Sequence, residues 1–189
     1  DRAASIRARR VTGPIARLVI AGKPVTLVLG DEVIIGRTEG TLLAPSHAVS
    51  RRHLRVARSG DDVTVHDLET RNGTQLRGMN VVGALSIGEG LELKLGKEVG
   101  VRLRPSPELP GFVEIELGGK RYCAALGPAR LPIAGWRLEA AHDGWIELVT
   151  DAEPAFIGDV ALVPRAALLA GDKIAKARSG EPAIEVLGA

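Results

Sequence analysis

Aromatic residues are scarce in this chain of 189 residues, and its first half has none. The two Phe, two Trp and one Tyr all lie after Gly111. A segment without aromatic rings cannot stack bases or sugars on aromatic platforms. We therefore expect no RNA-recognition, single-strand-binding or lectin-like site of that kind in residues 1–111.

Cysteine and long apolar runs are also lacking. The single cysteine, Cys123, allows no internal disulfide and indicates a reducing, cytoplasmic location. The longest apolar candidate, residues 155–171, is interrupted by Asp159, Pro164 and Arg165, so we expect no membrane association. The chain starts without Met and without a signal-peptide core, which indicates a segment of a longer protein.

The net charge changes sign at about the same position as the aromatic residues begin. Residues 1–110 carry a net charge of +5 and residues 111–189 a net charge of −3. The apolar content of 45% is that of a folded protein, and the length allows one domain or two small ones. The three prolines of residues 105–111 have no N–H to donate to a neighbouring strand, so we predict that this segment is a linker.

Short apolar runs separated by turn residues follow one another along most of the chain. Alternation of apolar and polar residues is clear in Val25–Leu29 and Leu91–Leu95, as in half-buried strands. Residues 1–13 are basic and polar and read as a flexible lead-in, and Ala166–Ala170 could form a helical turn. The pattern predicts an all-β sandwich or barrel.

An internal repeat is visible across the linker. Residues 15–30 resemble residues 112–127, with Gly-Lys and Leu-Gly at the same offset in both. Two further pairs of segments match in the same order, which favours a true repeat over two unrelated β-sandwiches that share hairpins.

Three short motifs occur in order within the first repeat. They are Gly36-Arg37, Ser50-Arg-Arg-His53 and Asn72-Gly73, followed by a Leu-Ser-Ile-Gly-Glu-Gly-Leu strand at residues 85–91. The ordered set resembles the forkhead-associated (FHA) domain over residues 14–104. The resemblance implies an eleven-stranded β-sandwich that binds phosphothreonine peptides through loops at one end. Residues 111–187 would then be a second, smaller FHA-like sandwich after the linker at 105–111.

The residues of the motifs suit phosphate recognition. Phosphothreonine carries about −1.5 to −2 charges and three acceptor oxygens, which require fixed cations and hydrogen-bond donors. An arginine can donate two parallel hydrogen bonds to a phosphate, and a hydroxyl can donate one. Arg71 could be a second phosphate ligand or could point outward toward acidic residues of the peptide. The predicted phosphopeptide-binding residues are Arg37, Ser50, Arg51, Arg71 and Asn72.

We predict that other residues of the motifs support the structure of the site and do not contact the ligand. Gly36, His53, Thr70 and Gly73 would shape the loops, and Asn72-Gly73 is typical of a hairpin turn. Ser50 and His53 could instead be a nucleophile and base, but no acidic partner for the histidine is evident. His47, His53 and His66 lack the spacing of a metal site, so we expect neither metal nor cofactor.

The second repeat lacks these residues. Trp136 aligns with Arg37, residues 38–53 have no counterpart, and Glu153-Pro154 falls near Asn72-Gly73. We therefore expect residues 111–187 to be a degenerate copy that does not bind phosphothreonine.

The leading hypothesis is a phosphothreonine-binding signalling or adaptor module, without enzymatic activity, whose partners are substrates of a Ser/Thr kinase. The second copy would give structural support or assemble with itself or another protein, since aromatic residues are enriched at interfaces. The alternative is a phospho-independent structural or oligomerisation module. Nucleic-acid binding by the basic half is disfavoured, because a net charge of this size is common on ordinary surfaces.

Overall fold

The computed structural model describes residues 2–189. Its sheets confirm the predicted all-β class, with one helix, α1 (Arg2–Arg9), among the described residues. Contacts divide the chain into two compact units. We call Gly30–Gly127 the central unit, and the described residues up to Leu29 together with Pro128–Ala189 the terminal unit.

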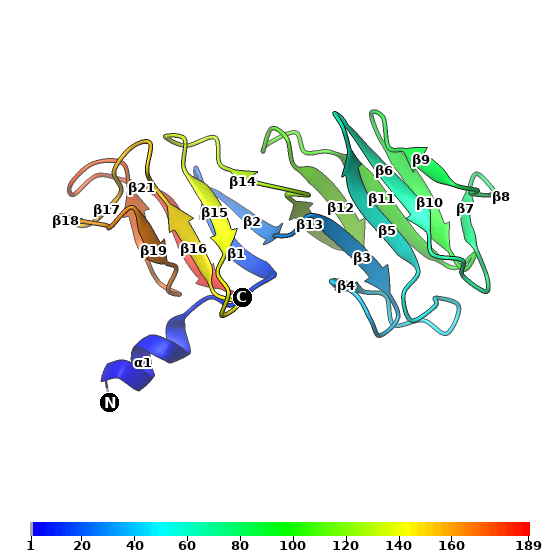
Figure 1. The fold of residues 1–189 in the computed structure, drawn as a ribbon, viewed down its shortest axis with the longest axis horizontal. Coiled ribbons are helices and arrows are strands. Elements are labelled where there is room, and N and C mark those ends of the chain that lie inside the picture. Colours follow the sequence, from blue (N-terminus) through cyan, green and yellow to red (C-terminus); the bar gives the residue numbers. More distant parts are fainter. Residues whose placement is uncertain (1) are drawn as a thin grey trace. The chain divides into compact units, whose positions relative to one another are not determined.

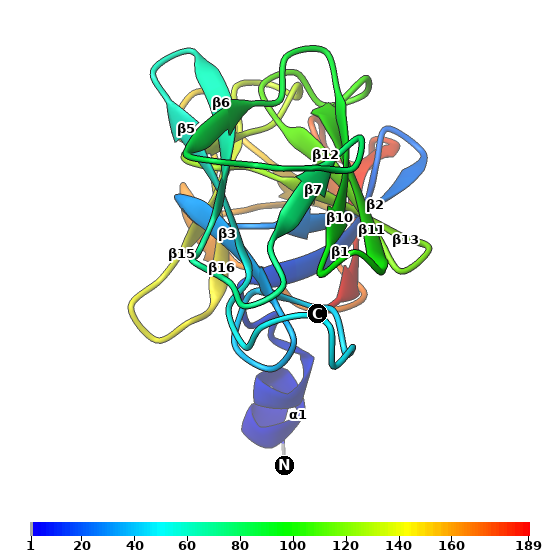
Figure 2. The ribbon, with the colours of Figure 1, turned by 90° about the vertical axis from the view of Figure 1, so that its right-hand side faces the viewer.

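The central unit contains two sheets that face each other (Figures 1 and 2). The first has the order β4-β3-β5-β6-β9, in which only β3 and β4 are parallel. Its strands are β3 (Glu32–Gly36), β4 (Leu42–Leu43), β5 (Leu54–Ser59), β6 (Asp62–Asp67) and β9 (Ala84–Ser86).

The second sheet of the central unit has the order β13-β12-β11-β10-β7-β8. Its strands are β7 (Thr74–Leu76), β8 (Met79–Asn80), β10 (Leu91–Leu95), β11 (Val99–Pro105), β12 (Val113–Leu117) and β13 (Lys120–Ala124). Alternate residues of these strands point inward, as in β10, where Leu93 and Leu95 are fully buried while Lys94 is exposed. The inward rows of the two sheets form the core of this unit.

The terminal unit also contains two antiparallel sheets. One has the order β18-β17-β20-β21-β1-β2 and the other β14-β15-β16-β19. The strands are β1 (Ile15–Ile20), β2 (Lys23–Val28), β14 (Ala129–Arg130), β15 (Arg137–Ala140), β16 (Ile146–Val149), β17 (Phe156–Ile157), β18 (Val160–Ala161), β19 (Arg165–Ala167), β20 (Lys173–Ala175) and β21 (Pro182–Gly188).

This division differs from the predicted domains at 14–104 and 111–187. The β1–β2 hairpin belongs to the terminal unit, because β1 pairs with β21. The β12–β13 hairpin belongs to the central unit, because β12 pairs with β11. Non-local strand pairing decides the boundaries, and no local sequence signal reports it.

The proline-rich segment 105–111 is an ordered loop between two paired strands. The Ser106 N–H donates to the carbonyl of Phe112 at 2.8 Å, and the Phe112 N–H donates to that of Leu109 at 3.0 Å. The side chains of Leu109 and Phe112 are buried. The segment therefore closes the β11–β12 hairpin and does not serve as the predicted linker.

The local structure of two further segments differs from the sequence analysis. Residues 1–13 were expected to be a flexible lead-in, but Arg2–Arg9 form α1, and Val11 is buried beside a backbone bridge between Thr12 and Trp145. The predicted helical turn at 166–170 overlaps β19, which pairs with β16. Among the described residues, no helix is long and apolar enough to cross a membrane.

Candidate functional site

The loops after β3 and β4 are held together by backbone hydrogen bonds at one end of the central sandwich. The Arg37 N–H donates to the carbonyl of Ser50 at 2.9 Å, and the Glu39 N–H donates to that of Arg51 at 3.0 Å. The His53 N–H donates to the carbonyl of Ile35 at 2.9 Å and ties the start of β5 to β3. The Gly-Arg and Ser-Arg-Arg-His motifs are thus adjacent in space.

Gly36 allows this close approach. A Cβ atom at this position would lie 2.0 Å from the carbonyl oxygen of Arg51 and 2.6 Å from that of Glu39. Both contacts are with backbone atoms, which cannot rotate away as a side chain could. The predicted structural role of Gly36 therefore has a steric cause, since any side chain would push the two loops apart.

An open hollow of about 660 Å³ lies between these loops and the segment before β7. Its lining includes every residue that the sequence predicted to bind phosphopeptide, although these residues span 36 positions of the chain. The lining residues are Arg37, Glu39, His47, Ala48, Val49, Ser50, Arg51, Arg52, Arg71 and Asn72.

The hollow carries an excess of unneutralised cations. Arg51 forms an ion pair with Glu39 at 3.5 Å, and both side chains are more than half exposed. Within residues 2–189, no carboxylate lies in ion-pair distance of Arg37, Arg52 or Arg71. The guanidinium groups of these three residues are therefore available to an anionic ligand.

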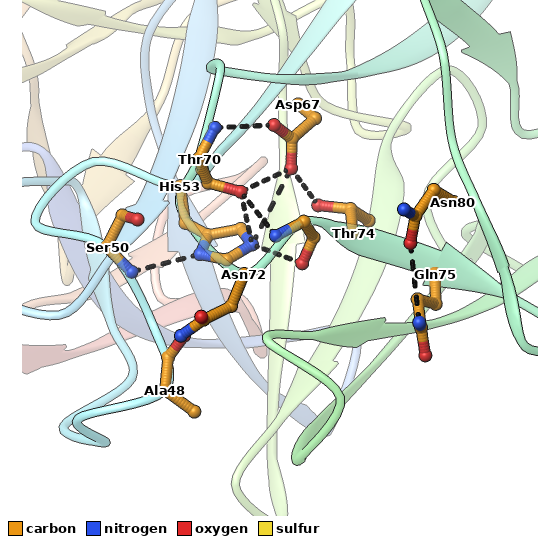
Figure 3. Close-up of polar contacts among 10 residues, drawn as sticks. Ala48, Ser50, His53, Asp67, Thr70, Asn72, Thr74, Gln75 and Asn80 are labelled. Carbon is orange, nitrogen blue, oxygen red and sulfur yellow. Dashed lines mark hydrogen bonds and ion pairs between the residues drawn. The ribbon is translucent and has the colours of Figure 1, made fainter.

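Asn72 fixes a second loop at the rim. Its Nδ2 donates to the carbonyl of Ala48 at 3.0 Å (Figure 3). The Gly96 N–H, in the β10–β11 turn, donates to the carbonyl of Gly73 at 2.9 Å. In the same region, the Ser46 hydroxyl donates to Glu98 at 3.2 Å. The side chain of Asn72 thus holds the loop that precedes Ser50 against the turn that precedes β7.

A polar network around buried His53 adjoins the residues that line the hollow (Figure 3). The imidazole of His53 is fully buried; its Nδ1 accepts from the Ser50 N–H at 3.0 Å, and its Nε2 lies 3.1 Å from the carbonyl of Gly73. This pattern assigns the neutral tautomer with the proton on Nε2, because Nδ1 must accept. The predicted supporting role of His53 thus has a defined geometry: one ring joins two motifs.

Asp67, at the end of β6, holds the turn that carries Asn72. Its carboxylate accepts from the Thr70 N–H at 2.8 Å, from the Thr70 hydroxyl at 2.8 Å and from the Thr74 hydroxyl at 2.6 Å. The Thr70 hydroxyl in turn accepts from the Gly73 N–H at 3.1 Å. The Thr70 hydroxyl and the Gly73 N–H thus form hydrogen bonds within this turn, and their supporting role in a ligand site stays a prediction.

The sequence analysis missed Asp67 and Thr74. A signal for Asp67 was present, because it continues the inward row of Val63 and Val65 in β6. A carboxylate in an inward position must find hydrogen-bond donors. The contact between Asn72 and the carbonyl of Ala48 could not be predicted in this way, because every residue has a backbone carbonyl and the residue type does not single one out.

Comparison with known proteins shows that the segment with these motifs matches a protein family. The FHA domain family model matches residues 33–96, which include all three motifs. Residues 33–96 are an FHA domain. The FHA domain-containing protein FhaB of Mycolicibacterium smegmatis is 36% identical over 88 residues, which are 46% of this chain and 55% of that protein. FhaB of Mycobacterium tuberculosis H37Rv is 32% identical over 91 residues, 48% of this chain and 53% of that protein.

The chain spans about half the length of these two relatives. Among solved structures, a protein from a study of phosphothreonine-dependent FHA domain interactions is 29% identical, with a TM-score of 0.33. The match covers 44% of this chain and 88% of that one.

Within the FHA domain, the Asn72-Gly73 pair is not the hairpin turn that the sequence indicated. The strands on its two sides, β6 and β7, belong to different sheets, so the turn carries the chain from one layer of the sandwich to the other. The alternative of a Ser50–His53 nucleophile pair also finds no support. The Nε2 atom of His53 does have an acidic neighbour, since it lies 3.7 Å from the carboxylate of Asp67. His53 contacts Ser50, however, through the backbone N–H, which donates to Nδ1 at 3.0 Å, so the ring does not activate the Ser50 hydroxyl.

The buried groups of the FHA domain have shifted pKa values. Burial lowers the pKa of His53, against the opposing effects of the Gly73 carbonyl and of Asp67. Burial alone would raise the pKa of Asp67, but hydrogen bonds from Thr70 and Thr74 hold it below its ordinary value. Among the described residues, no cluster of three or more His, Cys, Asp or Glu side chains could hold a metal ion.

Proposed function

We propose that this protein binds phosphothreonine-containing segments of partner proteins in the hollow of its FHA domain. The observation that carries the proposal is the set of three arginines, Arg37, Arg52 and Arg71, which line one hollow without a carboxylate partner among the described residues. The hydroxyl of Ser50 likewise has no hydrogen-bond partner within residues 2–189 and offers a neutral donor to the same ligand.

Each predicted ligand has a distinct part in this proposal. Arg37 and Ser50 contact the phosphate. Arg51 adds positive charge beside them, although its side chain also forms an ion pair with Glu39. Arg71 stands at the rim beside Asn72, where its guanidinium reaches either the phosphate or an acidic side chain of the peptide. Asn72 holds the loop and binds the peptide backbone. A module of this kind reads the products of a Ser/Thr kinase and performs no chemistry.

The test is a titration of the full chain with a fluorescent peptide library that contains a central phosphothreonine. The same peptides with threonine, phosphoserine and glutamate in that position are the controls. Saturable binding of the phosphothreonine set alone, weaker at higher ionic strength, would support the proposal. Equal binding to the threonine peptides would contradict it.

We also propose that the terminal unit is a degenerate FHA-like copy that supports the FHA domain and lacks a phosphate site. The orders β2-β1-β21-β20-β17-β18 and β13-β12-β11-β10-β7-β8 correspond strand by strand. The order β14-β15-β16-β19 likewise corresponds to β3-β5-β6-β9, without a partner for β4. Trp136, which the sequence aligned with Arg37, is fully buried and donates from Nε1 to the carbonyl of Glu153 at 2.8 Å. The strand registers instead make Trp136 equivalent to Leu54, because Leu138 pairs with Ala129 and Leu148 as Val56 pairs with Val33 and Val65.

The phospho-independent assembly role has less support. It was suggested by the aromatic residues of the second half, yet Trp136 and Phe112 are buried and no aromatic residue is among the exposed large apolar side chains. Self-association through this unit stays a prediction, to be tested by light scattering of the full chain. A cytoplasmic location also stays a prediction, which the single cysteine supports.

A further inference from the structure

Two hairpins of this chain have the same construction. In β1–β2, Leu18 pairs with Val25 and Ile20 with Lys23; in β12–β13, Ile115 pairs with Tyr122 and Leu117 with Lys120. Both hairpins turn through two residues of positive φ, Ala21-Gly22 and Gly118-Gly119. These are the segments that match in the sequence repeat, so the two hairpins are equivalent parts of the two repeats.

Each unit uses the hairpin of the other repeat. The FHA domain is preceded in the chain by β1–β2, but its β11 pairs with β12. The last strand of the chain, β21, pairs with β1. The registers are equivalent from Leu18 to Ile20, since Leu117 lies opposite Val101 where Ile20 lies opposite Ile184. At Arg17 a bulge shifts the β1–β21 register, which has no counterpart in the β11–β12 pairing. We propose that the β11 edge of the central unit is a docking surface for a hairpin, and that outward-facing charges select β12–β13 over β1–β2.

The apolar faces of the hairpins do not make this choice. The inward residues are Leu18 and Ile20 in β1 and Ile115 and Leu117 in β12, and all four are buried. Their similar volumes would fill either core, because cores tolerate volume-conserving exchanges of this kind. The ordered loop 105–111 already favours β12 as the neighbour of β11, and the other face of the sheet supplies a second difference between the two hairpins.

The outward residues of β11 and β12 are complementary in charge. Arg104 lies opposite Glu114, and their side chains form an ion pair at 2.7 Å. Arg102 lies opposite Glu116 and also forms an ion pair with Glu92 of β10 at 3.4 Å. Beyond Glu116, Arg121 of β13 continues the alternation of signs at 4.0 Å. A row of alternating charges thus crosses four strands.

The opposite assignment would place like charges together. By the repeat, Arg17 replaces Glu114 and Val19 replaces Glu116, so β1 on β11 would set Arg17 against Arg104. On β21, Glu116 would take the place of Val19 and face Glu185. Directly opposed like charges destabilise a sheet, whereas Val19 beside Glu185 is neutral. Charge therefore disfavours the unexchanged arrangement at both edges.

The test uses disulfides in the full chain, in a Cys123→Ala background. One variant carries Arg102→Cys with Glu116→Cys, and its matched control carries Arg102→Cys with Val19→Cys. Opposite residues of antiparallel strands are close enough for a disulfide. Mild oxidation and mass mapping should show the 102–116 bond within a single chain and no 102–19 bond. Formation of the 102–19 bond, or of neither bond, would overturn the proposal.

Charge reversal tests the selection itself. Adding Arg104→Glu to a chain with cysteines at 19, 102 and 116 should raise the ratio of 102–19 to 102–116 bonds roughly tenfold. Adding Glu114→Arg as well should restore the original ratio, and an unchanged ratio in both variants would contradict the role of charge. The inference rests on the proposed second copy. No peptide is present in these experiments, so a negative result would count against the hairpin proposal and would say nothing about phosphopeptide binding.

Discussion

The Nδ1 atom of His53 accepts a hydrogen bond from the Ser50 backbone N–H at 3.0 Å. A supporting residue is thereby joined directly to a predicted phosphate ligand. Protonation of Nδ1 would place two donors face to face, so the geometry requires the neutral imidazole. The stability of the FHA domain should consequently depend on pH.

The expected direction follows from the lowered pKa of His53. The unfolded chain takes up a proton near the ordinary histidine pKa of about 6.5, whereas the folded protein stays neutral to lower pH. The stabilisation is therefore complete above that pH, and the free energy of unfolding falls as the pH drops below it. Urea denaturation between pH 8 and 5 measures this better than peptide binding, because the phosphate titrates nearby.

His53→Gln supplies the matched variant for this experiment. Glutamine has no group that titrates in this range, so this slope should be missing from the variant, whatever its absolute stability. His66→Gln alters an exposed histidine of β6 and should keep the slope of the wild type.

A second loss of stability, below about pH 4, is expected from Asp67, whose lowered pKa makes the ionised form the stable one.

Arg37→Ala should weaken phosphothreonine-peptide binding by about 2–5 kcal/mol, the usual effect of truncating one partner of a desolvated charge pair. Arg37→Lys should recover only part of this loss, since a lysine cannot form the bidentate contact. Isothermal titration calorimetry gives both values. Arg130→Ala, an exposed arginine of β14, is the control and should bind as the wild type does. Unchanged affinity of Arg37→Ala would remove this residue from the site.

Asn72→Ala removes the hydrogen bond to the carbonyl of Ala48. The free energy of unfolding should fall by only about 0.5–1.5 kcal/mol, because one exposed hydrogen bond is lost. Peptide affinity should fall by more, since the variant also loses the amide that we propose binds the peptide backbone. Asn80→Ala, which breaks the nearby 3.3 Å bond from Gln75, is the matched control and should leave affinity unchanged. Equal affinities of the two variants would contradict the role of Asn72.

Gly36→Ala should destabilise the protein by about 1–3 kcal/mol and also weaken peptide binding, because its methyl group overlaps the backbone of the Arg51 loop. Gly100→Ala in β11 meets no atom within 4 Å and should change stability by less than about 0.5 kcal/mol. Thermal denaturation compares the two substitutions. Similar melting temperatures would show that the loops near Gly36 can separate without cost.

The sequence predicted the strands and the FHA motifs because both are local patterns. Alternation in Leu91–Leu95 places Leu93 and Leu95 in the core, and the motif spacing brings Arg37, Ser50 and Asn72 to one hollow. The phosphate contacts of these residues stay predictions until a peptide is bound.

The parts that sequence reasoning failed to find depend on distant partners. Nothing near Leu18 shows that it pairs with Val186. Three prolines suggested a linker, whereas the hydrogen bond from Ser106 to Phe112 makes the segment a closed loop. Asp67 is a different case, because its partners Thr70 and Thr74 are close in the chain and its inward position in β6 was a local signal outside the three motifs.

The exchange of hairpins sets an order of folding during synthesis. The central unit is one continuous stretch, Gly30–Gly127, so the FHA domain can complete its pairing soon after β13 leaves the ribosome. The β1–β2 hairpin is made before the central unit, yet its partner β21 is made after it. Until Pro182–Gly188 emerge, the hairpin has an unpaired edge and an uncovered apolar face. Residues 15–28 are therefore made before the central unit but reach their native contacts after it.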